Sequence, residues 1–252
     1  LPVTGYVVGA AASTYFASLW MKRVGRRNGF ITGTLFGIAG GAIATLGIAL
    51  GSFWTLVAGT LVLGTYNAFG QYYRFAAADA SPGPWKAKAI SLVMAGGLVG
   101  GIIGPEMSKV TRDLAQPTFV ASYASLIGFC LVTMAILSRL RIPAPRDEEV
   151  HGPSRPLAEI MAQPVFVVLV VVAALGYGVM NLLMTSTPLA MGFCGLPYAA
   201  AASVISAHVV AMFGPSFFTG SLIQRFGVLN VMMAGVVLMF ACGGIALSGQ
   251  PV

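Results

Sequence analysis

Long apolar segments, separated by short polar gaps, follow one another along almost the whole chain. A helix needs about 20 mostly apolar residues to cross the hydrocarbon core of a bilayer. Segments of about that length are Val3–Met21, Phe30–Leu50, Phe53–Tyr73, Ala89–Met107, Phe119–Leu137, Val165–Leu189, Ala199–Ile223 and Val228–Leu247. The pattern predicts an all-α membrane protein with eight transmembrane helices.

The basic residues fall in alternate gaps between these segments. They are Lys22, Arg23, Arg26 and Arg27 in the first gap, Lys86 and Lys88 in the third, Arg139, Arg141, Arg146 and Arg155 in the fifth, and Arg225 in the seventh. The other gaps are uncharged or carry balanced charges. Because cytoplasmic loops of membrane proteins carry an excess of lysine and arginine, the alternation predicts a multi-pass protein of the cell membrane whose basic gaps face the cytoplasm.

The composition agrees with a chain surrounded by lipid. Hydrophobic residues make up 57% of the sequence and charged residues 8%, with a mean hydropathy of +0.87. A soluble domain has roughly a quarter charged residues, so this chain cannot build a water-facing surface. The net charge of +7 follows from the basic gaps, and we interpret it as a topology signal, not as a nucleic-acid site. Cys130, Cys194 and Cys242 lack metal-binding spacing, so we expect no metal and no cofactor.

One polar stretch divides the chain. Residues 143–163 are rich in proline and charged residues, a composition typical of a cytoplasmic linker. The linker would join an N-terminal bundle, residues 1–142, to a C-terminal bundle, residues 164–252. Leu1 leads directly into an apolar segment, so we expect the chain to be a piece of a longer protein.

A short phrase occurs twice, once at the end of the first apolar segment and once at the end of the seventh. The matched pairs are Phe16 with Phe218, Arg23 with Arg225, and Gly25 with Gly227. Whole-bundle repeats of this kind are typical of secondary transporters. Six segments separate the copies and the linker falls between them. The arithmetic predicts two six-helix units, of which the chain holds helices 2–6 before the linker and helices 7–9 after it.

The repeated phrase resembles a loop pattern of the major facilitator superfamily, Gly-x-Leu-x-Asp-Arg-x-Gly-Arg-Arg. The first copy keeps Arg23, Gly25, Arg26 and Arg27, and the second keeps Arg225 and Gly227. The resemblance implies that superfamily's twelve-helix fold, here in part, and a monomer. The acidic position is Lys22 in one copy and Gln224 in the other. In the superfamily this acid belongs to a charge latch on the cytoplasmic side, so the sequence puts that latch in doubt.

A second pattern, Gly100, Gly104 and Pro105, resembles the Gly-x-x-x-Gly-Pro motif of drug and proton antiporters. With Gly96 these glycines form a stripe of small residues, which either serves conformational change or simply lets two helices pack closely. Thr60 stands where those antiporters have an arginine, which weakens the case for their mechanism. The stretches 184–191 and 208–220 resemble a bacterial subgroup that includes riboflavin transporters, and imply a bacterial cytoplasmic membrane.

Polar side chains at lipid depth are costly and usually face a cavity or the interior of the bundle. Asn67, Gln71 and Arg74 have spacings of four and three residues, which predicts one helix face that lines a solute pathway. The alternative for Arg74 is that it reaches the headgroups or pairs with Asp79.

A second polar face and a histidine complete the candidate pathway. Tyr177, Asn181 and Thr185 share a face of the sixth segment, with helix packing as the alternative. His208 lies near mid-membrane, where it could relay protons, or could stay neutral and bond to a backbone carbonyl.

These features predict a secondary active transporter that moves a small organic solute by alternating access, with proton coupling as one expectation. The alternative is a non-transporting member of the same fold, such as a receptor, a scaffold or an assembly factor. We expect no enzyme. His208 and Ser216 would be about 12 Å apart along one helix, too far for a base and its nucleophile.

Overall fold

The computed structural model describes residues 2–140, 142 and 156–248, and all regular structure in these ranges is helical. The helices are α1 (Pro2–Val24), α2 (Arg26–Ala49), α3 (Phe53–Gly70), α4 (Tyr73–Asp79), the 3₁₀ turn η1 (Gly83–Trp85), α5 (Lys86–Thr111), α6 (Val120–Arg139), α8 (Leu157–Met161), α9 (Pro164–Phe193), α10 (Tyr198–Phe213), α11 (Ser216–Phe226) and α12 (Val228–Leu247). Each of the eight apolar segments is mostly helical, as the hydropathy pattern predicts, and two of them are interrupted by a turn.

Within the described residues, six helical stretches are long and apolar enough to cross a membrane. They are Arg26–Ala49, Lys88–Thr111, Val120–Arg139, Pro164–Phe193, Tyr198–Phe226 and Val228–Ile245. The helices α1 and α3 are not among these six. An all-helical protein with several spans is therefore confirmed, whereas the number eight stays a prediction.

Two predicted spans are interrupted. The helix expected over Phe53–Tyr73 ends at Gly70, and α4 begins only at Tyr73. In between, the amide of Tyr72 donates to the carbonyl of Phe69 at 3.1 Å, a tighter turn than that of an α-helix. The seventh span divides at Gly214 and Pro215, because proline has no N–H for the helical ladder.

Close backbone approach holds the N-terminal helices together. The helix α3 packs against both α1 and α2, and α2 packs against α6. A Cβ added at Gly64 would overlap the Tyr6 carbonyl of α1, and one added at Gly40 would lie 2.7 Å from the Leu63 amide nitrogen of α3. Lipid offers no hydrophobic drive for helices to associate, so small residues supply the contact through van der Waals packing.

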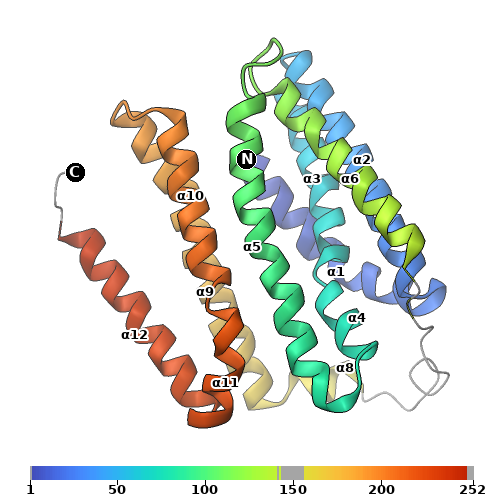
Figure 1. The fold of residues 1–252 in the computed structure, drawn as a ribbon, viewed down its shortest axis with the longest axis vertical. Coiled ribbons are helices and arrows are strands. Elements are labelled where there is room, and N and C mark those ends of the chain that lie inside the picture. The colour runs from blue at the N-terminus through green and yellow to red at the C-terminus, as the bar shows by residue number, and fades with distance from the viewer. Residues whose placement is uncertain (1, 141, 143–155, 249–252) are drawn as a thin grey trace.

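The helix α5 connects the N-terminal helices to those after the linker. It packs against α4, α10 and α11, and Figure 1 shows it between the two groups. The helices α9 and α12, which follow the linker, contain no buried residue among those described. Apolar side chains on such helices can face lipid without a protein cover.

Most of the predicted linker, residues 143–155, lies outside the described residues. Its described end contains α8, a short helix of 5 residues that lies directly before α9. The division into bundles 1–142 and 164–252 stays a prediction.

Candidate functional site

The repeated phrase forms the same turn in both places. Gly25 joins α1 to α2 with φ 83° and ψ 159°, and Gly227 joins α11 to α12 with φ 81° and ψ 157°. This backbone region is essentially restricted to glycine. No atom of the described residues lies within 4 Å of where a Cβ would stand at either position, so the backbone angles and not the available space require glycine. The sequence repeat is therefore also a conformational repeat.

The first copy carries two arginines that tie helix ends together. Arg26 forms an ion pair with Asp79 at the end of α4. Arg27 donates from Nε to the Leu137 carbonyl at 3.3 Å and from Nη2 to the Ser138 carbonyl at 2.5 Å, both in the last turn of α6. Carbonyls at a helix C-terminus lack intrahelical partners and attract cations. The loop thus joins α2 to α4 and α6.

These contacts revise two interpretations of the sequence. Asp79 pairs with Arg26, so the pairing considered for Arg74 is not formed. The loop has Lys22 at its acidic position, and the acid that reaches this loop in the structure is Asp79 of α4, which pairs with Arg26. The second copy has Val228 in place of Arg26, and there Arg225 lies over the Phe226 ring at 5.4 Å.

The polar set of the third segment does not share one uninterrupted helix. Asn67 is half-buried on α3, Gln71 is exposed in the turn, and Arg74 is half-buried on α4. The Arg74 guanidinium lies 5.0 Å from the centre of the Phe75 ring, while its Nε is buried without a hydrogen-bond partner in the described structure. A buried donor of this kind requires an explanation, because leaving it unpaired costs free energy.

The polar set on α9 is largely exposed. Tyr177 is 57% exposed, Thr185 is exposed, and half-buried Asn181 donates from Nδ2 to the Tyr177 carbonyl at 3.0 Å. The main packing partner of α9 is α10, whereas α3 packs against α1 and α2. The described structure therefore does not bring this set together with Asn67 and Arg74.

His208 lies on α10, and its Nε2 atom is buried without a hydrogen-bond partner among the described residues. The alternative of a bond from this nitrogen to a backbone carbonyl is therefore not formed. Val209, the next residue, is buried where α10 packs on α5. Of the candidate pathway residues, Arg74 and His208 each have a buried nitrogen with no hydrogen-bond partner in the described ranges.

The glycines of α5 pack on a different face from the one expected. In the part of the chain that the structure describes, a Cβ added at Gly96, Gly100 or Gly104 would meet nothing within 4 Å. The neighbouring stripe makes the helix contact: a Cβ at Gly97 would lie 2.9 Å from the Phe213 ring, and one at Gly101 would overlap Val209. Pro105 lies within α5 without ending it.

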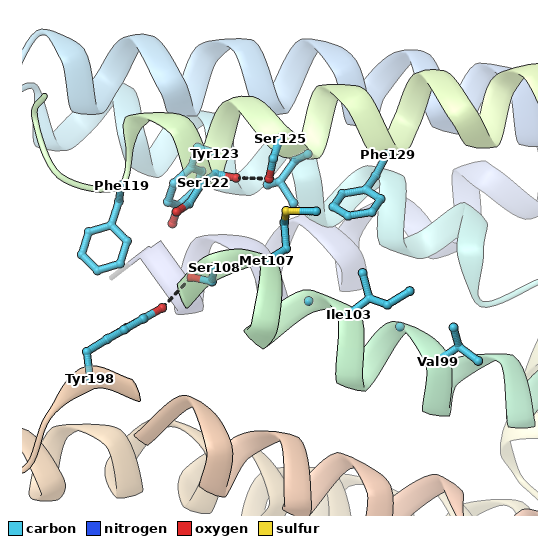
Figure 2. A pocket seen from close by; sticks show the side chains of 13 residues that line it. Val99, Ile103, Met107, Ser108, Phe119, Ser122, Tyr123, Ser125, Phe129 and Tyr198 are labelled. Carbon is cyan, nitrogen blue, oxygen red and sulfur yellow. Dashed lines mark hydrogen bonds between the residues drawn. The ribbon is translucent and has the colours of Figure 1, made fainter. Parts of the chain in front are cut away.

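Gly100 and Gly104 instead line a groove of about 610 Å³ between α5 and α6. Figure 2 shows its hydroxyl-bearing end, where Ser108 of α5 and Tyr198 of α10 share a hydrogen bond of 2.5 Å. None of the predicted pathway residues lines this groove.

The structure contains a polar cluster between α5 and α10 that the sequence does not predict. Besides Ser108 and Tyr198, Lys109 donates from Nζ to Ser203 Oγ at 2.9 Å, and the Arg112 guanidinium lies 4.9 Å from the centre of the Tyr198 ring. The sequence offers only a charge-balanced gap at these positions. Partners about 90 residues apart leave no local signal.

Comparison with known proteins agrees with this architecture. The Major Facilitator Superfamily matches residues 1–252. The chain is 42% identical over 252 residues to the riboflavin transporter RfnT of Brucella anthropi, covering 99% of this chain and 63% of the relative. It is 27% and 26% identical to YdeG and YddS of Bacillus subtilis, two uncharacterized MFS-type transporters, over 62% and 60% of their lengths.

The chain thus spans about three fifths of the length of these relatives. No solved structure matches it. The apolar helices, the repeated glycine turn and the match over every residue lead to one conclusion: this multi-pass membrane protein belongs to the Major Facilitator Superfamily.

Proposed function

We propose that this protein is a secondary active transporter that moves a small organic solute across the cytoplasmic membrane by alternating access. The observation that carries the proposal is the 42% identity to a riboflavin transporter over 99% of the chain. Riboflavin is therefore the first solute to test, and a flavin-like solute is the class we propose.

The packing of α5 supports movement between two groups of helices. Phe213 and Val209 of α10 pack directly against Gly97 and Gly101 of α5, and the α10–α11 break at Pro215 lies close to this contact. Small sliding or hinge motions of packed helices are a common basis of domain movement. Alternating access requires such a motion around a central site.

The unpaired nitrogens of Arg74 and His208 support a polar pathway. The planar guanidinium of arginine suits a carbonyl-rich or anionic group of a solute. Histidine exchanges a proton near neutral pH, which suits coupling to a proton gradient. Asn67 and Gln71 would add hydrogen-bonding groups near Arg74. The α9 set of Tyr177, Asn181 and Thr185, which the described structure does not bring together with Asn67 and Arg74, would serve the C-terminal side of the pathway.

The test is riboflavin uptake into membrane vesicles that contain the full-length protein, with and without a pH gradient. We expect Arg74→Ala and Asn181→Ala to lower uptake about tenfold, as loss of a hydrogen bond to a solute would. Asn230→Ala is a matched control, because Asn230 on α12 also donates to the carbonyl four residues earlier, at 2.9 Å.

Unchanged uptake in both pathway variants would show that the assigned residues are wrong, even if the protein transports riboflavin. Riboflavin binding without any flux would favour the alternative, a non-transporting receptor of this fold. Flux of another solute, with none of riboflavin, would keep the transporter and exclude the proposed solute class.

A further inference from the structure

A second groove, of about 630 Å³, lies on the surface where α1, α2 and α3 meet. We call it the α1–α2 groove and define it by residues that line it, Phe16, Trp20, Arg23, Thr32, Phe36 and Phe69. Its volume is in the range of small-molecule sites. No candidate pathway residue lines this groove, so the proposed solute pathway does not explain why the groove is there.

The interior of the α1–α2 groove is apolar because its polar wall groups are already paired. Ser13 and Thr65 share a hydrogen bond of 2.9 Å, and Trp20 donates from Nε1 to Thr32 Oγ1 at 3.2 Å. The surfaces that remain are largely aromatic: Phe36 stacks on Phe69 with ring centres 6.3 Å apart. Such a surface accepts a hydrocarbon chain and offers little to a polar solute.

One end of the α1–α2 groove carries a positive charge. Arg23 stands in the last turn of α1 and is exposed, and no described acidic side chain forms an ion pair with it. Its neighbours Arg26 and Arg27 are engaged with Asp79 and with the end of α6. A guanidinium at the mouth of an apolar groove complements an anionic headgroup, and the planar fork binds phosphate with two hydrogen bonds.

The length of the groove matches one leaflet. Ten residues separate Ser13 from Arg23, which is about 15 Å along a helix. The hydrocarbon core of a bilayer is about 30 Å thick, so one leaflet has about the same length. Arg23 belongs to a basic gap, and such gaps lie at the cytoplasmic headgroups.

We propose that the α1–α2 groove binds an anionic phospholipid of the cytoplasmic leaflet, with the phosphate on Arg23 and an acyl chain along Trp20 and Phe36. This site does not depend on which solute the protein carries. It would link the glycine turn at Gly25 to the lipid composition of the membrane, since Arg23 and Gly25 belong to the same loop.

Native mass spectrometry of the purified full-length protein, released from nanodiscs, tests the proposal. The nanodiscs contain phosphatidylglycerol and phosphatidylcholine with identical acyl chains. We expect phosphatidylglycerol to be retained preferentially, and Arg23→Gln to weaken that retention about fivefold, the effect of one basic residue at an anionic surface. Lys22→Gln removes the same charge one residue away, outside the groove lining, and should keep the preference.

Arg23→Lys separates charge from geometry and should retain the lipid at an intermediate level, because lysine lacks the planar fork. Three outcomes would overturn the proposal. These are equal retention of both lipids by the unmodified protein, unchanged retention in Arg23→Gln, or an equal loss in Arg23→Gln and Lys22→Gln. The last would indicate a general surface charge effect, and equal retention of both lipids would indicate a groove that any apolar chain fills.

Discussion

At the scale of single residues, positions 25 and 227 require glycine because of their backbone angles. Both residues link two helices with no further connecting residue, and both have nearly identical positive φ angles. Side chains are excluded there by backbone strain and not by crowding. This separates the two glycines from Gly64 and Gly40, where a neighbouring helix occupies the space.

We expect Gly25→Ala and Gly227→Ala each to lower the free energy of unfolding by about 1–3 kcal/mol, the usual strain of a non-glycine residue in this region. Thermal unfolding of the purified protein in detergent measures the effect. Gly100→Ala is the control, since a Cβ there meets no atom and a helical φ suits alanine. Unfolding temperatures equal to the unmodified protein would contradict the assigned strain.

The partners of Arg26 and Arg27 cannot be predicted from the residues around them in the sequence. The loop pattern identifies Arg26 and Arg27, but their partners lie 53 and about 110 residues away, at Asp79 and at the end of α6. The sequence therefore predicts that these residues matter without predicting what they bind.

At the scale of elements, α5 carries two adjacent stripes of glycine with different surroundings. Gly97 and Gly101 face α10, whereas Gly100 and Gly104 line the groove toward α6. The sequence spacing cannot tell which of the two stripes packs against another helix, because both repeat every four residues. Only the position of α10 distinguishes them.

We expect Gly101→Leu to destabilise the protein by about 1–3 kcal/mol, since the added side chain must displace Val209. Gly100→Leu on the next stripe should have a much smaller effect. Comparing the thermal unfolding of the two variants tests which stripe packs. Equal destabilisation, or a larger effect at Gly100, would show that the α5–α10 contact is wrongly placed.

The break between α3 and α4 is also decided at this scale. Tyr72 donates its hydroxyl to the Thr14 carbonyl of α1 at 3.1 Å, so a contact between helices holds the turn. The sequence contains no proline there, and hydropathy continues to Tyr73. The sequence for that reason predicts a single uninterrupted helix over Phe53–Tyr73. This prediction is wrong, because α3 ends at Gly70 and α4 begins at Tyr73.

At the scale of the whole molecule, the polar cluster of Ser108, Lys109 and Arg112 with Tyr198 and Ser203 joins the two groups of helices at the far end of α5. This end lies opposite the basic gaps, so it is expected at the outer face. If the proposed transport mechanism holds, these contacts must separate in each cycle.

We expect a cross-link between Lys109→Cys and Ser203→Cys to stop transport. The lysine reaches Ser203 across the two helices, so a bifunctional maleimide about as long as a lysine side chain can bridge the two cysteines. Uptake before and after cross-linking is the measurement, and each single cysteine treated with the reagent is the control. Full uptake by the cross-linked protein would mean that α5 and α10 stay together at this end.

Tyr198→Phe should loosen the same contact without removing the ring that Arg112 covers. Loss of one hydrogen bond corresponds to about 0.5–1.5 kcal/mol, or about a two- to tenfold shift of the equilibrium toward separation. The cross-linking rate of the cysteine pair should fall accordingly. Tyr15→Phe, at an exposed tyrosine of α1, should leave the rate unchanged, and an unchanged rate in Tyr198→Phe would exclude this hydroxyl from the contact.

The sequence alone determined the helical class, the membrane environment and the repeat, because each depends on residues close together in the chain. An apolar segment in lipid has to satisfy its own backbone hydrogen bonds and becomes a helix whatever its neighbours are. The glycine turns are equally local, since their φ angles concern one residue.

The tertiary structure alone decided which glycine stripe of α5 packs, which acid pairs with Arg26, and that Asn67 and Asn181 belong to helices with different packing partners. These outcomes depend on how whole helices lie against each other. In lipid, where no hydrophobic drive favours one apolar face over another, shape complementarity between distant segments makes that choice.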